Sequence, residues 1–233
     1  MSVLSALFGR AYDSEDDPAK VRAMPVVLRV ERDLPGRTPL LEAAAAAAVA
    51  LCLDPRAQPE GEWHDDVHSW IDGRIRKVSR RARGAHWEAV QSEPGVTVSV
   101  GGAEARALLP WRVAETPKVV SRLQISGTEL PIDTPGPVPD GVPVLWVNPG
   151  VEMTVGKLAA QVGHGSMLLA ALAEADGIDL STWDFYCAVR TATPAAWPAL
   201  AGGTWESDRV VAVRDAGFTE VDPGTVTVVA QWR

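Results

Sequence analysis

The sequence has no long hydrophobic segment and only two cysteines. Its longest apolar run, residues 40–53, is rich in alanine and contains Glu42, which favours a buried helix over a membrane span. The first ten residues are too short and too weakly apolar for a secretory signal. Cys52 and Cys187 lie in apolar surroundings without a CxxC pattern, so we expect buried free thiols. Together these absences predict a cytoplasmic protein that does not bind a membrane.

Positive charge is scarce in the second half of the chain. The net charge is −8, and from residue 142 onward five basic residues stand against ten acidic ones. Residues 74–83 (RIRKVSRRAR) hold six basic residues in ten positions. Because a polyanion is bound through Lys and Arg, a nucleic-acid partner would have to contact the first half.

For the first half, the sequence predicts a mobile arm over residues 1–24, followed by strands and helices. The apolar spacing predicts a strand at 24–30, a helix at 38–53 and a second, amphipathic helix at 61–83. The basic residues of the second helix would face solvent; they are Arg74, Arg76, Lys77, Arg80, Arg81 and Arg83. Further strands are predicted at 85–90, 95–100 and 118–125, with a short helix near 103–111.

Residues 131–143 contain five prolines and two glycines and predict an interdomain linker at 132–143. A similar order of elements then repeats, with strands at 143–147, 183–189, 209–213 and 225–232 and helices at 154–174 and 194–201. The sequence therefore predicts an α/β protein with two similar small domains, residues 25–131 and 144–233, related by duplication. Each would have a mixed, mostly parallel four-stranded sheet flanked by helices, and the two would form a pseudo-dimer.

The helix at 154–174 has polar residues on one face near its start. With Thr154 as N-cap, Lys157, Gln161 and His164 follow at i, i+4 and i+7 and project from the same side. A lysine in the first turn opposes the helix dipole, so helix stability does not account for it. The alternative is an ordinary solvated face.

The segment RDAGFTEVDPGT, residues 214–225, connects two predicted strands. Its glycines and Pro223 are typical of turns, and an ordinary turn is one interpretation. Its length is not typical, because hairpin loops usually need two to five residues. Asp215 is the polar group here that we favour for chemistry, followed by Thr219; Glu220 and Asp222 would serve the turn.

Together, GKLAAQVGH and VRDAGFTEVDPGTVTVVA resemble the type II peptidyl-tRNA hydrolases, over roughly residues 142–232. The resemblance implies a small α/β domain with a mixed four-stranded sheet and cleavage of the ester between a peptide and the 3′ ribose of tRNA. The functional residues that it implies are Lys157, Gln161, His164, Asp215, Thr219, Gly224 and Thr225. No cofactor is implied, and no His, Cys or acidic cluster has the spacing of a metal site.

Ester hydrolysis requires an activated water and positive charge or hydrogen-bond donors near the oxyanion. The resemblance assigns the water to Asp215 and the oxyanion, or a terminal tRNA phosphate, to Lys157. Thr219 and His164 would hydrogen-bond the water or the leaving ribose. Gln161, Gly224 and Thr225 would contact the substrate.

Two features depart from the family pattern. Residues 148–153 (NPGVEM) replace an Arg-x-Asp-Leu-like run, and the first half has leucines at the lysine position and Gln124 where we align Asp215. We therefore expect the first half to be an inactive pseudo-subunit that replaces the partner of the family's homodimer, so that a monomer suffices. Its six basic residues would contact the tRNA backbone. Alternatives are a solvated basic face, a non-catalytic module that binds RNA or protein, and an esterase or amidase for a smaller substrate.

Overall fold

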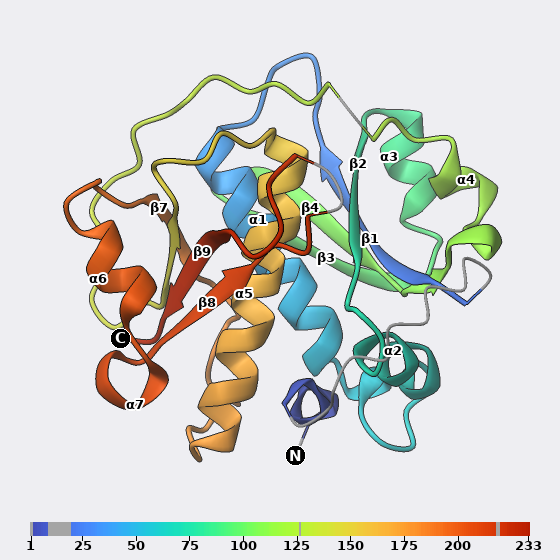
Figure 1. The fold of residues 1–233 in the computed structure, drawn as a ribbon. Coiled ribbons are helices and arrows are strands. Elements are labelled where there is room, and N and C mark those ends of the chain that lie inside the picture. Colours follow the sequence, from blue (N-terminus) through green and yellow to red (C-terminus); the bar gives the residue numbers. More distant parts are fainter. Residues whose placement is uncertain (1, 9–19, 126, 218–219) are drawn as a thin grey trace.

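The computed structural model describes residues 2–8, 20–125, 127–217 and 220–233, which form two mixed sheets around a central pair of helices (Figure 1). The first sheet has the order β2-β1-β4-β3, with β5 paired to β1, and the second has the order β7-β6-β9-β8. The strands are β1 (Arg22–Arg29), β2 (Lys77–Ala82), β3 (Gly95–Val100), β4 (Ala103–Leu108), β5 (Trp111–Arg112), β6 (Val144–Val147), β7 (Ala188–Thr191), β8 (Val210–Arg214) and β9 (Val226–Gln231). The α/β class is confirmed.

The helices vary widely in length. They are α1 (Arg37–Leu53), α2 (His64–Ile71), α3 (Ala85–Val90), α4 (Lys118–Ser121), α5 (Val155–Ala175), α6 (Trp197–Gly202) and α7 (Trp205–Asp208), with short 3-10 turns η1 (Val3–Leu7), η2 (Pro55–Ala57) and η3 (Val113–Glu115). No helix in the described part of the chain is both long and apolar enough to cross a bilayer. The long helices α1 and α5 were predicted closely.

Both sheets are mostly antiparallel, so the prediction of mostly parallel sheets is wrong. The first sheet has five strands rather than the predicted four, because β5 adds to β1. Among the described strands, only β1 with β2 and β6 with β7 run parallel. A parallel neighbour requires a long crossover, usually a helix, and each half has such a helix only between its first two strands. Of the antiparallel pairs, β3–β4 and β8–β9 connect consecutive strands, whereas β1–β4, β1–β5 and β6–β9 join strands that are distant in sequence.

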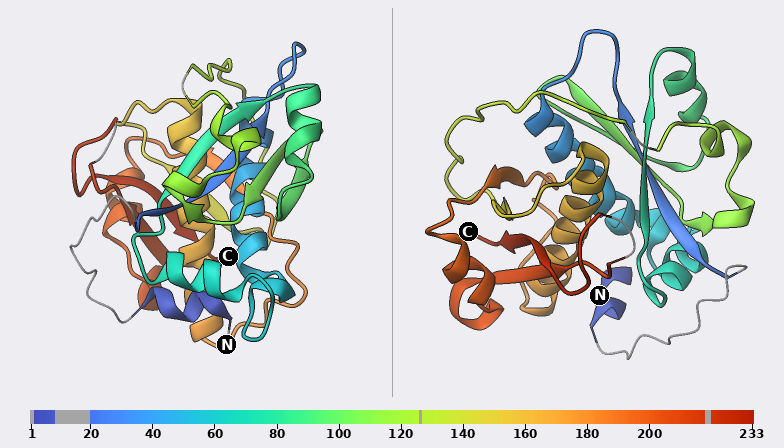
Figure 2. Two further views of the ribbon diagram at one scale, coloured as in Figure 1. Left: turned by 90° about the vertical axis from the view of Figure 1, so that its right-hand side faces the viewer. Right: turned by 45° about the horizontal axis from the view of Figure 1, so that its top comes forward.

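The helices α1 and α5 pack directly against each other, and each also contacts the sheet of the other half (Figures 1 and 2). α1 lies on β3 and β4 and reaches β7, whereas α5 lies on β8 and β9 and reaches β2. Small residues allow this close approach: the Ser166 hydroxyl donates to the carbonyl of Ala45 at 2.8 Å, and a Cβ at Gly163 would lie 3.1 Å from the Cβ of Ala48. The alanine run of α1 is therefore buried on all sides.

A buried ion pair also joins the halves. Glu42 of α1 accepts hydrogen bonds from the main-chain nitrogen of Val189 at 3.1 Å and from Arg190 Nη1 at 2.9 Å. Both charged side chains are largely removed from solvent. The single acidic residue in the apolar run thus satisfies groups at the edge of the second sheet.

The basic segment is a strand, so the prediction of one helix over 61–83 is wrong. The helix α2 ends at Ile71, the chain turns through Gly73 and Ile75 (φ 42°), and residues 77–82 form β2. Alternate side chains of β2 then point to opposite sides of the sheet, and neither side is a free solvent face. Tertiary pairing with β1 overrides the helical spacing of the apolar residues.

Other assignments in the first half are also corrected. Residues 85–90 are helical rather than extended, residues 103–108 form β4 rather than a helix, and α4 occupies the start of the predicted strand 118–125. In β4 the small residues Ala103, Ala105 and Ala107 are buried. Because alternate residues of a strand lie on the same side, these three alanines share one face, and their small size allows α1 to approach the sheet. A helix would not place all three on one face.

The two ends of the predicted mobile arm belong to the fold. Val3 and Leu4 of η1 are buried in the main core, and Ser2 hydrogen-bonds to Glu174 at the end of α5. β1 already begins at Arg22, and residues 9–19 lie outside the described residues. The linker segment 131–143 forms no helix or strand, although its Asp133 binds the main-chain nitrogen of Thr38 at 2.8 Å and the hydroxyl at 2.6 Å.

Candidate functional site

The candidate site lies where the start of α5 meets the loop between β8 and β9. Thr154 is the N-cap of α5, as predicted, and its hydroxyl accepts from the main-chain nitrogen of Lys157 at 3.2 Å. Glu220 in the loop accepts from the main-chain nitrogen and the hydroxyl of Thr154 at 2.9 and 2.8 Å. The loop is thereby fixed to the first turn of the helix.

Asp215 is held by donors from three directions. Its carboxylate forms a salt bridge with Lys157 Nζ through Oδ2, and the same oxygen accepts from Gln161 Nε2 at 2.9 Å. Oδ1 accepts from the main-chain nitrogen of Gly217 at 2.8 Å. Asp215 is only 6% exposed, so these contacts operate with little screening by water. The predicted residues Lys157, Gln161 and Asp215 thus meet at one point, although 58 positions of sequence separate the first from the last.

Thr227 completes this cluster and was not predicted. Its hydroxyl donates to Gln161 Oε1 at 2.5 Å, and the residue is fully buried. The pairing of β8 with β9 changes register between Val213 and Arg214, so that a bulge lies at this position. A bulge changes the direction of a side chain, and simple alternation along the strand could not reveal that Thr227 faces α5.

His164 is one helical turn further along α5 and binds a residue of the first half. Its Nδ1 lies 2.9 Å from Nζ of Lys77 on β2. Desolvation lowers the pKa of Lys77 from 10.5 to about 7. Desolvation, together with the charges of Lys77 and Lys157, lowers the pKa of His164 well below its ordinary value, which favours a neutral ring. Both side chains still keep part of their surface accessible.

The remaining predicted residues of the loop have backbone roles. The Asp215 main-chain nitrogen donates to the Thr225 carbonyl at 2.9 Å, and the Gly224 nitrogen donates to the Asp215 carbonyl at 2.7 Å. Gly224 has a φ of 80°, which favours glycine at this closure. Contact of Gly224 and Thr225 with a substrate stays a prediction. Thr219 lies outside the described residues.

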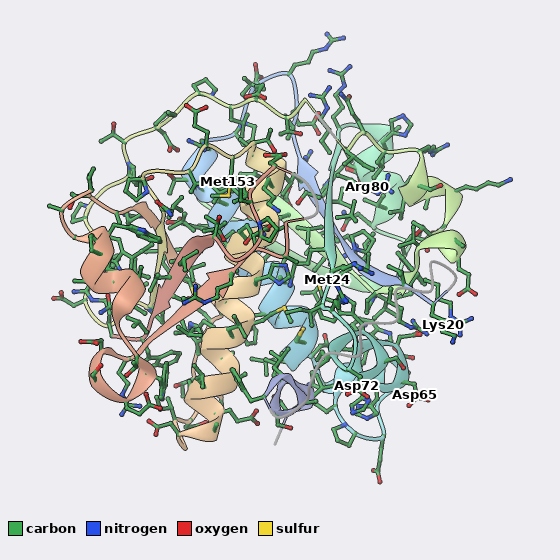
Figure 3. The ribbon with its side chains drawn as sticks, in the orientation of Figure 1. Lys20, Met24, Asp65, Asp72, Arg80 and Met153 are labelled. Carbon is green, nitrogen blue, oxygen red and sulfur yellow. The ribbon has the colours of Figure 1, made fainter. Side chains whose placement is uncertain are left out.

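The six basic residues of residues 74–83 do not form one exposed face, so that prediction is wrong. Arg80 donates to the carbonyls of Ser121 and Leu123 on the side of α4, where Figure 3 labels it, and Arg81 donates to Gln124. Lys77 points the other way, to His164. Arg74 and Arg76 are partly exposed; of these six described residues, Arg83 is the one in the exposed class. The cause is the two-sided pattern of a strand.

The alignment of Gln124 with Asp215 is also wrong. Strand order makes β3 the counterpart of β8, and β3 joins β4 through only Gly101 and Gly102, whose φ values of 54° and 81° suit a tight hairpin. The second half has residues 215–225 at this place. The first half thus lacks the whole loop that carries Asp215, not just the carboxylate.

The thiols of Cys52 and Cys187 are free and buried, as predicted, and burial raises the pKa of Cys52 to about 12. Among residues 2–8, 20–125, 127–217 and 220–233, no three His, Cys, Asp or Glu side chains gather as a metal site would require. Comparison of the chain with family models, curated proteins and solved structures gave no match. The function must therefore be inferred from the residues and their geometry.

Proposed function

We propose that the protein hydrolyses the ester that joins a peptide to the 3′ ribose of tRNA, in the cytoplasm, at the Lys157–Asp215 site. The observation that carries this proposal is the convergence of Lys157 and Gln161 of α5 on Asp215 from the β8–β9 loop. The sheet beside them has four strands and is mixed, as the resemblance to type II peptidyl-tRNA hydrolases implies. An ordinary turn or an ordinary helix start does not require these three side chains to meet.

In the proposed reaction, Asp215 orients a water and accepts its proton as the water oxygen attacks the ester carbonyl. Lys157 has three hydrogens on Nζ, so it can keep its bond to Asp215 while another hydrogen faces the developing oxyanion. The ester C–O bond then breaks, and the proton passes from Asp215 to the 3′ oxygen of the ribose. His164 hydrogen-bonds the ribose, and Gln161 and Thr227 keep the carboxylate in place.

The first half would act as an inactive pseudo-subunit, and the molecule as a monomeric pseudo-dimer of domains 25–131 and 144–233. The identical strand order and the reciprocal contacts of α1 and α5 support a tandem duplication. When VLRV at residues 27–30 is aligned with VLWV of β6, the fully buried Leu40 falls at the position of Lys157. The first half therefore has neither the lysine nor the loop.

A second candidate function is hydrolysis of a smaller ester or amide. It is favoured by the basic residues, since Lys77, Arg80 and Arg81 are committed to internal hydrogen bonds and leave less positive charge for tRNA phosphates. The exposed Arg83 lies beside Glu31, Arg32, Asp33 and His86, which makes a hollow of mixed charge.

The test is cleavage of N-acetylated aminoacyl-tRNA by the wild type and by Lys157→Met and Asp215→Asn. We expect each variant to lose roughly 100-fold or more in kcat/KM, the scale for losing an oxyanion donor or a proton acceptor. Asp222→Asn is the matched control, because Asp222 is exposed in the same loop and contributes its main-chain carbonyl to Thr225. Each variant is first shown to be folded by circular dichroism.

The outcomes separate the candidates. Cleavage of p-nitrophenyl esters with no cleavage of the tRNA substrate would support the small-substrate enzyme. Binding of tRNA without cleavage would identify a non-catalytic module. Equal activity of the wild type and both site variants would remove Lys157 and Asp215 from the mechanism.

A further inference from the structure

We infer that Lys77, a residue of the first half, holds His164 of the second half with its proton on Nε2 and thereby positions it as a hydrogen-bond donor to the substrate. This inference rests on the proposed function and adds a positioning residue to it. Lys77 would act through His164 rather than on the substrate. The site would then be built from both halves of the chain.

The side chain of Lys77 reaches His164 by passing close to Gly163 of α5. Lys77 lies on β2, which α5 contacts, and its Cδ and Cε would lie 3.3 Å from a Cβ at Gly163, the residue before His164. This separation is tighter than an ordinary carbon contact, so a glycine at 163 leaves room for the lysine to cross the helix. The lysine and the glycine are therefore matched across the contact between the halves.

The amine is also supported from a second side. Nζ of Lys77 lies 5.0 Å from the centre of the Trp70 ring, within the range of a cation–π contact. Trp70 is buried, and its indole nitrogen donates to the carbonyl of Arg76 at 2.8 Å, which fixes the ring beside β2. Nζ is thus placed between an aromatic face and the His164 ring, 2.9 Å from Nδ1.

The chemistry of the two groups determines the tautomer. Below the pKa of Lys77, about 7, Nζ is an ammonium group that only donates hydrogen bonds. Nδ1 must then offer its lone pair, and the one ring proton of a neutral imidazole is on Nε2. Burial opposes a second proton on the ring, and the charges of Lys77 and Lys157 have the same effect. Cys52, which is near Lys77, is held as a neutral thiol by its burial. A neutral ring with Nε2–H can donate to a ribose oxygen but cannot accept the proton of the attacking water at Nδ1.

The experiment measures the tautomer directly. Protein labelled with ¹⁵N-histidine is studied by long-range ¹H–¹⁵N correlation from pH 5.5 to 8, and the His164 signals are assigned by their loss in His164→Gln. In the wild type we expect an unprotonated Nδ1 and a protonated Nε2 below pH 7, where Lys77 is charged, and no second proton on the ring down to pH 5.5. In Lys77→Met we expect the pKa of His164 to rise relative to the wild type, because one of the two opposing charges is removed while burial and Lys157 remain. Lys118→Met, which removes an exposed lysine, should leave the His164 signals unchanged.

Kinetics on N-acetylated aminoacyl-tRNA then tests the role of the pair. Lys77→Met should lower kcat about 10-fold with little change in KM, the scale for losing the group that orients a functional histidine. In a His164→Ala background, the same substitution should have no further effect, because Lys77 acts through His164.

A wild-type His164 that carries its proton on Nδ1, or that titrates near pH 6.5, would overturn the inference whatever the activity. If the wild type shows the inferred tautomer but cleaves no ester, the proposed function and the role of Lys77 in it are overturned. The contact between Lys77 and His164 would still stand. Additive losses in the double variant would show that Lys77 acts independently of His164 and would also overturn the inference.

Discussion

Replacing Lys77 by methionine should change how the stability of the protein depends on pH. Desolvation lowers the pKa of Lys77 to about 7 in the folded protein, whereas an unfolded lysine titrates near 10.4. Between these values the unfolded chain binds more protons than the folded one, so the free energy of unfolding rises with pH. Below pH 7 both states are protonated, and the cost of burying the cation is fully present.

The size of the effect follows from the two pKa values. One proton gives a slope of at most about 1.4 kcal/mol per pH unit, and Lys77 is only half titrated at pH 7. From pH 7 to pH 9 this residue should therefore add about 2 kcal/mol to the stability of the wild type. Methionine has a similar length and no charge, so the Lys77→Met protein should lack this increment.

Urea unfolding at pH 7, 8 and 9 measures both proteins, and the difference between them cancels the groups that they share. Lys118→Met provides the control, since it removes a lysine from an exposed position on α4 and should keep the wild-type dependence. A difference between the wild type and Lys77→Met that stays constant within about 0.5 kcal/mol from pH 7 to 9 would refute the argument. Lys77 would then not be a desolvated amine beside His164.

Three further substitutions test the site and the contact between the halves. Thr227→Val removes the hydroxyl that donates to Gln161 and should cost about 1–3 kcal/mol in urea unfolding, because a buried amide oxygen loses its partner. Glu42→Gln should lower stability by roughly 3 kcal/mol in the same assay, since a buried arginine loses its counter-charge. Gly217→Ala should lower kcat on the order of 10-fold or more, because φ is 80° and the new Cβ would lie 2.3 Å from the ring of Pro223.

The substitutions at Thr227 and Gly217 each have a matched control. Thr227→Ser keeps the hydroxyl and should retain most of the stability that valine loses. Gly224→Ala has the same φ of 80° but open space around its Cβ, so it should disturb the loop less than the substitution at Gly217. Equal stability for the Ser and Val variants at 227, unchanged stability after Glu42→Gln, or equal kinetics for the two glycine variants would contradict the corresponding explanation.

The long elements could be predicted from the sequence because their patterns are local. The alanine-rich α1 and the capped α5 have strong helix formers and clear boundaries, and the second-half strands have β-branched runs. Residues 77–82 could not be assigned in this way. Their spacing also fits a helix, and what makes them a strand is pairing with β1 and hydrogen bonds of Arg80 and Arg81 to residues distant in sequence.

The site was predictable to the extent that it depends on spacing. The positions of Lys157, Gln161 and His164 on one helical face follow from the sequence, and the length of the β8–β9 loop points to Asp215. Thr227 depends on a bulge, and Lys77 comes from the other half, so neither has a local signal. Comparison of the two halves by sequence misaligned Gln124 with Asp215, since β3 and β4 are joined by two residues whereas residues 215–225 join β8 and β9.

The bond between Glu42 and the edge of the second sheet has a consequence for how the chain can be cut. Because α1 is enclosed by both sheets and by α5, the halves share a single interior, and the segment 131–143 mainly keeps the two pieces at a high local concentration. A protease that cleaves this exposed segment should produce two fragments that stay together as one particle.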